Sequence, residues 1–200
     1  MKKTPNTVAI IQARMGSVRF PGKVMKPITG VPMIGLLIER LSRAELVDRI
    51  VLATSTDSVN DPLEEYVHGL GYDVFRGSEE DVLDRYFCAA KQFDADVIVR
   101  ITGDCPLVDP DVVDTVISAR DLEQVDYAAN FWVAPYPVGK TPTFPDGLDV
   151  EVFRFEALEE ASRRAETRHE REHVTPYLRE AYFTHHTLAH SEDLSNERWV

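Results

Sequence analysis

Cysteine is scarce in this sequence, which has only Cys88 and Cys105 among its 200 residues. Two cysteines cannot build a disulfide framework, and their spacing does not resemble a paired-cysteine metal site. Long hydrophobic runs are also missing. None approaches the roughly 18 residues of a membrane helix, and the apolar run near the basic start is too short for a signal peptide. We therefore expect a cytoplasmic protein in a reducing compartment, with no membrane partner.

Basic side chains are outnumbered. The chain carries 22 lysines and arginines against 34 aspartates and glutamates, which gives a net charge of −12. A general nucleic-acid or anionic-membrane binder would present a basic face, so this balance argues against both classes. The sequence shows no internal repeat and no low-complexity segment. Its length suits a single domain over residues 1–200.

What the chain does have is an alternation of strand and helix patterns. Short apolar, β-branched runs such as VAIIQ are typical of strands buried on both faces. The expected strands are 8–12, 49–55, 72–77, 96–104, 147–153 and 182–190. The expected helices are 33–45, 61–71, 78–94, 109–121, 153–166 and 171–181, with Ser78 capping the third and Pro176 bending or interrupting the last. This order predicts an α/β fold with a mainly parallel sheet covered by helices.

A loop rich in cations, ARMGSVRFPGK, follows the first strand. Ligands of open α/β sheets bind beyond the carboxyl ends of the strands, which is where this loop lies. Gly16 allows a tight turn, and its amide together with that of Ser17 can hold an anion. Arg14, Arg19 and Lys23 supply positive charge. The loop matches neither GxxxxGK[ST] nor GxGxxG. The pattern favours a phosphate site, with a solvated basic loop as the alternative.

Further segments extend this pattern in order along almost the whole chain: IIQARMGSVRFPGKVMKPITGVPMI, VLATS, FRGSEEDVLDRY, DVIVRITGDCPLVDP, PDGLDVEVF and REHVTPYL. Together they resemble the cytidylyltransferase family that includes CMP-KDO and CMP-sialic acid synthetases. They are most similar to the spore-coat polysaccharide biosynthesis protein F branch. The resemblance implies a three-layer α/β/α Rossmann-like nucleotidyltransferase fold, a nucleoside triphosphate substrate, Mg²⁺ and an activated sugar as product.

Carboxylates near the ends of two predicted strands are candidates for a metal site. Asp104 can bind a Mg²⁺ ion that bridges phosphate oxygens. The alternative is a turn-forming aspartate, and the resemblance favours the metal role. Asp149 and Glu151 share one face of a strand pattern, where they contact Mg²⁺ or sugar hydroxyls, or else lie on an ordinary solvent face. Asp109 and Asp111 are expected to cap the following helix.

Other binding residues rest on the resemblance. In related transferases the loop after VLATS and the junction before the third helix read the base and ribose. The residues implied there are Thr54, Ser55, Arg76, Gly77, Ser78, Asp81 and Arg85. The residues implied at the sugar-acid end are Arg171, Glu172 and His173. Arg100 is either a ligand contact or part of an internal ion pair, because a buried arginine needs an anionic partner.

The predicted activity is transfer of CMP from CTP to a sugar or sugar acid, with release of pyrophosphate. The predicted catalytic residues are Arg14, Lys23 and Asp104, with Mg²⁺ on Asp104 and Asp149. The predicted substrate-binding residues are Ala13, Gly16, Ser17, Arg19, Thr54, Ser55, Gly77, Ser78, Arg100, Asp149, Glu151 and His173. One alternative is a nucleotide-sugar-dependent glycosyltransferase, whose Asp-x-Asp motif has the letters of residues 109–111. Another is a nucleotide-binding module without catalysis.

Three further expectations concern segments outside these motifs. In the resembled family the stretch after SNERWV contains an aspartate pair of the type VDTPEDL that helps to hold the metal, so we expect a chain truncated at its C-terminus. The apolar excursion at 131–138 suits either a homodimer contact or a substrate lid. Cys105 with His173 has the residue types of a thiol nucleophile and its base, but a buried structural cysteine is the better interpretation.

Overall fold

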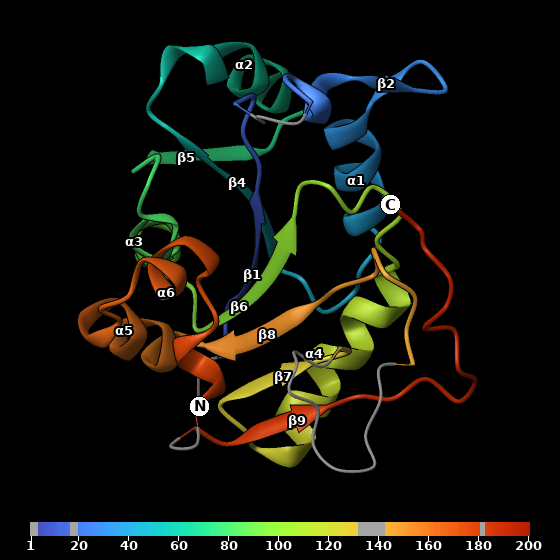
Figure 1. Cartoon of the computed structure of the whole chain (residues 1–200), viewed down its shortest axis with the longest axis vertical. Helices are drawn as coiled ribbons and strands as arrows, with labels where there is room; N and C mark the ends of the chain where they lie inside the picture. The colour runs from blue at the N-terminus through green and yellow to red at the C-terminus, as the bar shows by residue number, and fades with distance from the viewer. Residues whose placement is uncertain (1–3, 17–19, 132–142, 181–182) are drawn as a thin grey trace.

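The computed structural model describes residues 4–16, 20–131, 143–180 and 183–200. Its centre is a seven-stranded sheet in the order β5-β4-β1-β6-β8-β7-β9 (Figure 1). The strands are β1 (Thr7–Gln12), β4 (Arg49–Ser55), β5 (Asp73–Gly77), β6 (Val97–Thr102), β7 (Tyr127–Ala129), β8 (Glu151–Arg154) and β9 (His185–Thr187). All neighbours pair parallel except β8, which runs antiparallel to β6 and to β7. The mainly parallel sheet is confirmed.

Helices cover both faces of this sheet. The helices are α1 (Met33–Leu41), α2 (Asp61–Gly69), α3 (Val82–Gln92), α4 (Pro110–Glu123), α5 (Phe155–Arg164) and α6 (Arg168–His173). Figure 1 shows α1 and α4 on one side of the sheet and α3, α5 and α6 on the other. The three-layer α/β/α arrangement is therefore confirmed.

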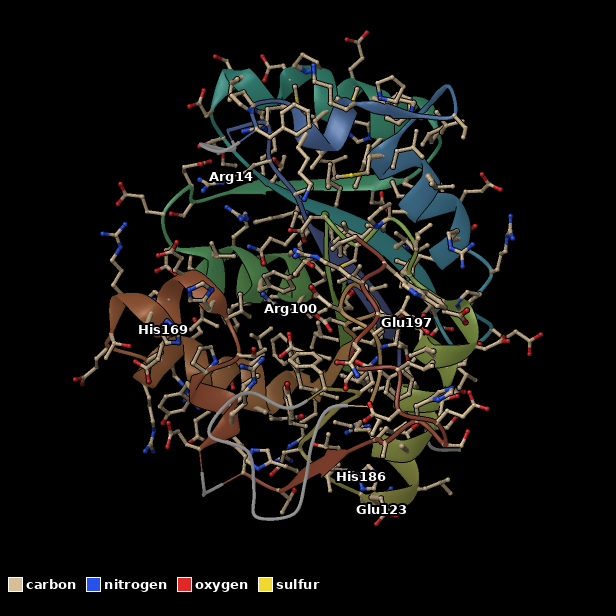
Figure 2. The ribbon with its side chains drawn as sticks, turned by 45° about the vertical axis from the view of Figure 1, so that its right-hand side comes forward. Arg14, Arg100, Glu123, His169, His186 and Glu197 are labelled. Atoms are coloured by element: carbon tan, nitrogen blue, oxygen red, sulfur yellow. The ribbon has the colours of Figure 1, made fainter. Side chains whose placement is uncertain are left out.

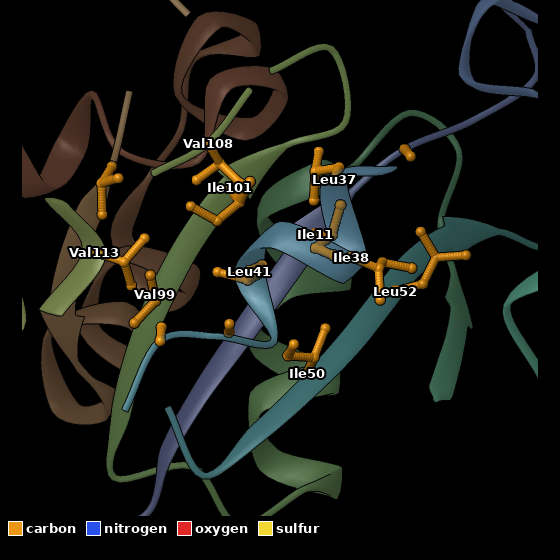
Figure 3. Packing of buried hydrophobic residues seen from close by; sticks show 14 of the residues in the cluster. Ile11, Leu37, Ile38, Leu41, Ile50, Leu52, Val99, Ile101, Val108 and Val113 are labelled. Carbon is orange, nitrogen blue, oxygen red and sulfur yellow. The ribbon is translucent and has the colours of Figure 1, made fainter. Parts of the chain in front are cut away.

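The core divides into two clusters because alternate residues of a strand point to opposite faces. On β1, Ala9 and Ile11 belong to the cluster under α1, α2 and α4, and Val8 and Ile10 to the cluster under α3 and α5. Figure 3 shows the first cluster, where Leu37 of α1 lies beside strand residues of the sheet. Continuous apolar strand sequences thus reflect burial on both faces.

Short elements complete the fold. These are the 3₁₀ turns η1 (Lys23–Met25), η2 (Ser58–Asn60) and η3 (Tyr177–Arg179), and the small hairpin β2 (Pro27–Ile28) and β3 (Val31–Pro32). The first turn and the hairpin lie between β1 and α1, so the cation-rich loop leads directly into ordered structure. Among the described residues, no helix combines the length and apolar character needed to cross a bilayer.

Helix starts differ from the prediction in one instructive case. The helix expected from residue 78 begins at Val82, and its N-cap is Asp81, whose Oδ1 accepts a hydrogen bond from the Asp84 amide at 2.9 Å. Ser78 as the cap was wrong. Its hydroxyl instead accepts from the Asp81 amide at 3.0 Å and so orders the turn before the helix. The negative charge of Asp81 at the start of the helix also complements the helix dipole.

Two other element boundaries differ from those expected from the sequence. The segment expected as one helix over 171–181 is split: α6 ends at His173, and Val174 adopts a positive φ of 69° before the turn that follows Pro176. Interruption near the proline is confirmed, although the break falls at the valine. The strand expected from residue 147 begins only at Glu151, so Asp149 precedes the strand.

Candidate functional site

The site lies where the direction of the chain across the sheet reverses. The chain moves from β1 outward through β4 and β5, and then returns to place β6 on the other side of β1. Such a switch point is where open α/β sheets bind ligands, at the carboxyl ends of the strands. The loops after β1 and β6 begin there with Ala13 and Gly103, and the Gly103 amide donates to the Gln12 carbonyl at 2.8 Å.

Gly103 allows this close approach. A Cβ at Gly103 would lie 2.6 Å from the Ala13 Cβ and 2.9 Å from the Gln12 carbonyl oxygen. Only a residue without a side chain lets the two strand ends meet at this distance. The "G" of the TGD sequence therefore positions the aspartate that follows it.

A cavity of about 1250 Å³ opens at this edge of the sheet. Its walls are the loop after β1, the junction between β5 and α3, the start of the loop after β6, and α6. The predicted site residues that line it are Ala13, Arg14, Lys23, Asp81, Arg85, Arg100, Asp104, Arg171, Glu172 and His173. The volume is that of a site for a nucleotide-sized ligand.

Opposite charges from different loops face each other across the cavity. The Lys23 Nζ lies 3.7 Å from the Asp104 carboxylate, and Arg14 forms an ion pair with Glu79. Arg14 is labelled in Figure 2 at the upper side of the site. Burial raises the pKa of Glu79, but hydrogen bonds from Ser55 and Arg14 outweigh it and lower that pKa. Arg14 and Lys23 are therefore placed at the cavity, each with a carboxylate partner.

The structure does not place the other predicted residues of this loop at the cavity. Gly16 is exposed beside Glu79 and does not line the cavity. Ser17 and Arg19 lie outside the described residues, as does almost all of the excursion at 131–138. Their assignments stay predictions.

A second carboxylate lies near Asp104. Burial first, and then the nearby carboxylates of Asp146, Glu151 and Asp104, raise the pKa of Asp149 to about 6 against the opposing effect of Arg100. Excess negative charge held away from water is what a divalent cation neutralises, and Mg²⁺ takes one or two carboxylates plus substrate oxygens. Carboxylates such as Asp104 and Asp149 are the ligand type that Mg²⁺ takes, but Asp149 does not line the cavity, and their shared metal role stays a prediction. Within the described part of the chain, no group of three His, Cys, Asp or Glu side chains could hold a metal by itself.

Arg100 and Glu151 form a buried ion pair on adjacent strands. They are directly opposite in the β6–β8 register, and the Glu151 carboxylate also accepts from Arg179 at 2.6 Å and from the Tyr127 hydroxyl at 2.7 Å. Although burial raises the pKa of Glu151, Arg100 and Arg179 lower it to about 2. The expected solvent face is wrong for Glu151, which is 1% exposed. For Arg100 the ion-pair alternative is confirmed, and it lines the cavity as well.

The structure does not bring every predicted contact to the cavity. Thr54 and Ser55 are fully buried, and the Ser55 hydroxyl accepts from the Asn60 side-chain amide at 2.7 Å. Gly77 packs tightly, since a Cβ there would lie 2.8 Å from the Phe75 ring. Besides Gly16, the predicted residues that do not line the cavity are Thr54, Ser55, Arg76, Gly77, Ser78, Asp149 and Glu151. Strand periodicity could not separate residues at the cavity from those just behind it.

Cys105 is a structural residue. It is 4% exposed, its Sγ lies 3.2 Å from the Thr102 hydroxyl, and burial raises its pKa to about 11. Thiolates are the reactive form of cysteine, and this environment disfavours them. The interpretation as a buried cysteine is confirmed.

Helix α6 forms the wall opposite the cation-rich loop. Arg171 donates to both carboxylate oxygens of Asp81, with Nε distances of 3.0 and 2.9 Å, and to the Ser162 carbonyl at 2.7 Å. This fixes α6 against the start of α3. The sequence HEREH at 169–173 has the letters of a zinc-protease motif, but the Glu170 carboxylate accepts from the Thr167 amide and hydroxyl in a capping box.

Some cavity residues were missed by the sequence reasoning. These are Gln12, Phe20, Val24, Glu79, Glu80, Val82, Thr102, Gly103, Glu166, Arg168 and Arg198. Arg198 reaches the site because the C-terminal segment lies along residues 146–147: the Trp199 amide donates to the Asp146 carbonyl at 2.7 Å. Glu197 of this segment is labelled in Figure 2. No motif marks the segment, so only the fold reveals it.

Comparison with known proteins agrees with this geometry. The cytidylyltransferase family profile matches residues 8–192. The chain belongs to the cytidylyltransferase family. Members of this family are nucleotidyltransferases, and the predicted resemblance is confirmed.

Individual cytidylyltransferase relatives cover most of the chain. An uncharacterized protein of Methanocaldococcus jannaschii is 39% identical over 86% of this chain and 67% of its own length. The spore coat polysaccharide biosynthesis protein SpsF of Bacillus subtilis is 37% identical over 85% of this chain and 68% of its own length. A cytidylyltransferase structure from Leptospira borgpetersenii superposes with a TM-score of 0.88 at 33% identity, covering 98% of this chain and 80% of that one.

More distant solved structures support the fold. A CMP:2-keto-3-deoxy-manno-octonic acid synthetase complexed with CTP superposes with a TM-score of 0.71 at 22% identity, covering 92% of this chain and 90% of that one. At this identity the likeness establishes the Rossmann-like architecture alone.

Proposed function

We propose that this protein transfers CMP from CTP to a hydroxyl of a sugar or sugar acid and releases pyrophosphate. The observation that carries the proposal is the pair Lys23 and Asp104, 3.7 Å apart on two loops that meet at the switch point of the sheet. Lys23 would supply a positive charge that binds phosphate, and Asp104 would supply a carboxylate that binds the metal ion. Both lie at the wall of a cavity large enough for a nucleotide. The names of the relatives support cytidine as the base and a sugar acid as the acceptor.

The chemistry requires positioning and charge neutralisation more than a covalent step. Arg14 and Lys23 would hold the triphosphate. Asp104 and Asp149 would hold Mg²⁺, which supplies neutralisation of charge on the phosphate oxygens when bound. The acceptor hydroxyl would attack the α-phosphorus in line, from the side of α6.

The existing ion pairs prepare the cations for this role. Lys23 and Arg14 are paired with carboxylates that are partly exposed, so the energetic cost of exchanging them for phosphate oxygens is small. A triphosphate offers bidentate acceptors to the arginine. Binding would thus replace Arg14–Glu79 and Lys23–Asp104 by contacts to phosphate and free Asp104 for the metal.

The Asp-x-Asp sequence at 109–111, which suggested a glycosyltransferase, is the start of a helix. Asp109 is the N-cap of α4, accepting from the Asp111 amide at 2.9 Å and the Val112 amide at 3.4 Å. Asp111 lies in the first turn of the helix. The expected capping by Asp109 is confirmed, and the Asp-x-Asp letters belong to a helix start. A nucleotide-binding module without catalysis stays the second candidate.

The name of the SpsF relative supports a role in cell-surface polysaccharide synthesis. We place the reaction in the cytoplasm, since both cysteines are free thiols and the donor is a nucleotide. A homodimer stays a prediction, because the segment that suggested it lies almost wholly outside the described residues.

Thermal unfolding with CTP, UTP, GTP, ATP and dTTP, each with and without Mg²⁺, tests the donor. A ligand at one hundred times its dissociation constant stabilises by about 2.7 kcal/mol, which raises Tm by roughly five to ten degrees in a domain of this size. We expect a shift with CTP that grows with Mg²⁺. Pyrophosphate release with CTP, Mg²⁺ and a panel of sugar acids then tests turnover. CTP binding without release from any acceptor would favour the non-catalytic module, and no shift with any nucleotide would contradict both.

A further inference from the structure

Arg100 occupies an unusual place for a charged residue. It lies in the middle of the sheet on β6, beside Ile10 of β1 and Glu151 of β8 in the strand register. Its side chain is 11% exposed and faces the cavity together with Gln12. Figure 2 shows Arg100 near the middle of the view and Arg14 above it, nearer the upper part of the molecule. An arginine here is costly to bury and therefore calls for a ligand or a structural reason.

Its internal contacts do not use all of its donors. One terminal nitrogen donates to Glu151, and the other reaches the Gln12 amide oxygen at 3.3 Å, which is a long hydrogen bond. The Nε is buried and has no hydrogen-bond partner within the described ranges. A guanidinium has five N–H donors in a planar fork. Each terminal nitrogen carries a second N–H, and these groups, not the buried Nε, give Arg100 donor capacity at the cavity wall.

Arg100 does not have a carboxylate partner to itself. Glu151 is the carboxylate in direct contact with Arg100, and it also pairs with Arg179 at 2.6 Å and accepts from Tyr127 at 2.7 Å. Two guanidinium groups thus share one buried carboxylate. Asp149 is a further carboxylate whose pKa Arg100 lowers, and the proposed function assigns it to Mg²⁺. This leaves Arg100 able to accept a further anionic partner from the cavity.

We propose that Arg100 determines acceptor specificity by binding the carboxylate of an acidic acceptor, with Glu151 holding its guanidinium in place. The proposal rests on the proposed function, since it concerns the acceptor of the same reaction. Lys23 and Arg14 are on loops at the edge of the cavity, where we expect the triphosphate to bind. Arg100 is on the strand behind them, at a depth where a small planar anion fits its fork. A neutral sugar would leave these N–H groups of Arg100 without an anionic partner, so the site should bind neutral sugars less well than acids.

The chain provides a matched pair of variants. Arg100→Gln and Arg179→Gln each remove one of the two cations on Glu151, and each leaves the other cation and Tyr127 in place. Both variants should therefore fold, with comparable losses of stability. Only Arg100 lines the cavity. A purely structural role predicts the same behaviour for both variants, whereas a ligand role predicts a difference.

Sodium pyruvate serves as a carboxylate probe that requires no knowledge of the sugar. Its effect on Tm is compared with that of sodium phosphate and of sodium chloride at equal ionic strength, with and without CTP and Mg²⁺. We expect pyruvate to raise Tm in the wild type and in Arg179→Gln, and not in Arg100→Gln. Equal shifts in Arg100→Gln and wild type, or no shift in wild type, would overturn the proposal. If phosphate but not pyruvate raised the Tm of the wild type, and Arg100→Gln lost that increase, Arg100 would bind the triphosphate instead. That result would overturn the proposal.

Turnover provides the second readout. With CTP, Mg²⁺ and 2-keto-3-deoxy-manno-octonic acid as acceptor, Arg100→Gln should raise KM for the acid by about tenfold or more, with kcat much less affected. Arg179→Gln should leave that KM near the wild-type value. Equal KM changes in both variants would contradict a ligand role. If CTP does not shift Tm of the wild type, the proposed function fails separately, because the pyruvate titration without nucleotide still tests Arg100.

Discussion

Lys23 and Asp104 lie 3.7 Å apart, Nζ to carboxylate oxygen, although they belong to different loops of the fold. The contact exists because β1 and β6 are neighbours whose carboxyl ends coincide, with Gln12 beside Thr102 in the register. Both side chains are partly exposed, at 37% and 58%, so the pair itself stabilises the fold by only about 0–1 kcal/mol. Its importance is therefore positional: it brings together the cation that we propose binds phosphate and the carboxylate that we propose binds Mg²⁺.

Asp104→Asn should abolish Mg²⁺-dependent turnover and leave the fold intact. The amide keeps the shape of the side chain and removes the negative charge that a divalent cation requires. Pyrophosphate release measures turnover, and thermal unfolding measures stability. The matched control is Asp109→Asn, a carboxylate lost from the same loop. Asparagine caps a helix as well as aspartate does, so this control should keep both Tm and turnover. Activity retained by Asp104→Asn would exclude Asp104 as a metal ligand.

Lys23→Gln should weaken CTP binding. A hydrogen bond to a charged group contributes about 1.5–3 kcal/mol, so the dissociation constant should rise by about 10- to 150-fold, as measured by calorimetry. Lys26→Gln removes an equal charge nearby, where the Nζ lies 5.8 Å from the centre of the Phe20 ring. Lys26 does not line the cavity, and its replacement should change CTP affinity little. Similar losses in both variants would indicate a general field of positive charge instead of a specific contact.

The sheet and its helices could be predicted because burial on two faces leaves continuous apolar strands and periodic helices. Arg14, Lys23 and Asp104 could also be placed, since loops after neighbouring parallel strands share an edge. By contrast, the sequence could not show that Glu151 binds two arginines from β6 and η3, because a charged residue on a strand pattern does not reveal its partner. Likewise, nothing local to Arg198 indicates that the C-terminal segment returns to the cavity.

The start of α3 illustrates a different limit. Both Ser78 and Asp81 are good N-cap residues, and the sequence alone offered no basis for choosing between them. The choice depends on Arg171, which lies on another helix and binds the Asp81 carboxylate. A tertiary ion pair thus fixes a local boundary, and propensity alone does not determine it.

Arg171→Lys should destabilise the contact between α6 and α3. Arginine donates to both oxygens of Asp81 and also to Ser162, and a lysine cannot reproduce this planar pattern. Because the pair is partly exposed, with side chains 23% and 34% accessible, we expect a loss of about 1–2 kcal/mol from its hydrogen bonds. A double-mutant cycle with Asp81→Asn, which keeps the cap, measures the coupling in urea. A coupling energy near zero would show that α6 is held by other contacts.

Gly103→Ala should both destabilise the protein and lower its activity. The added Cβ would lie 2.6 Å from the Ala13 Cβ and 2.9 Å from a backbone oxygen, and backbone cannot yield as a flexible side chain does. The ends of β1 and β6 must then separate, which moves Lys23 away from Asp104. Overpacking of this kind costs about 1–3 kcal/mol, which urea unfolding can measure alongside pyrophosphate release.

Gly69→Ala is the comparison for that substitution. Gly69 is the last residue of α2, and nothing lies within 4 Å of a Cβ built there. Alanine should therefore be neutral or stabilise by up to about 1 kcal/mol, through its higher helix propensity and the reduced freedom of the unfolded chain. If Gly103→Ala matched Gly69→Ala in stability and turnover, the strand ends would not need their close approach. The geometry that joins Lys23 to Asp104 would then have to be maintained by the loops themselves.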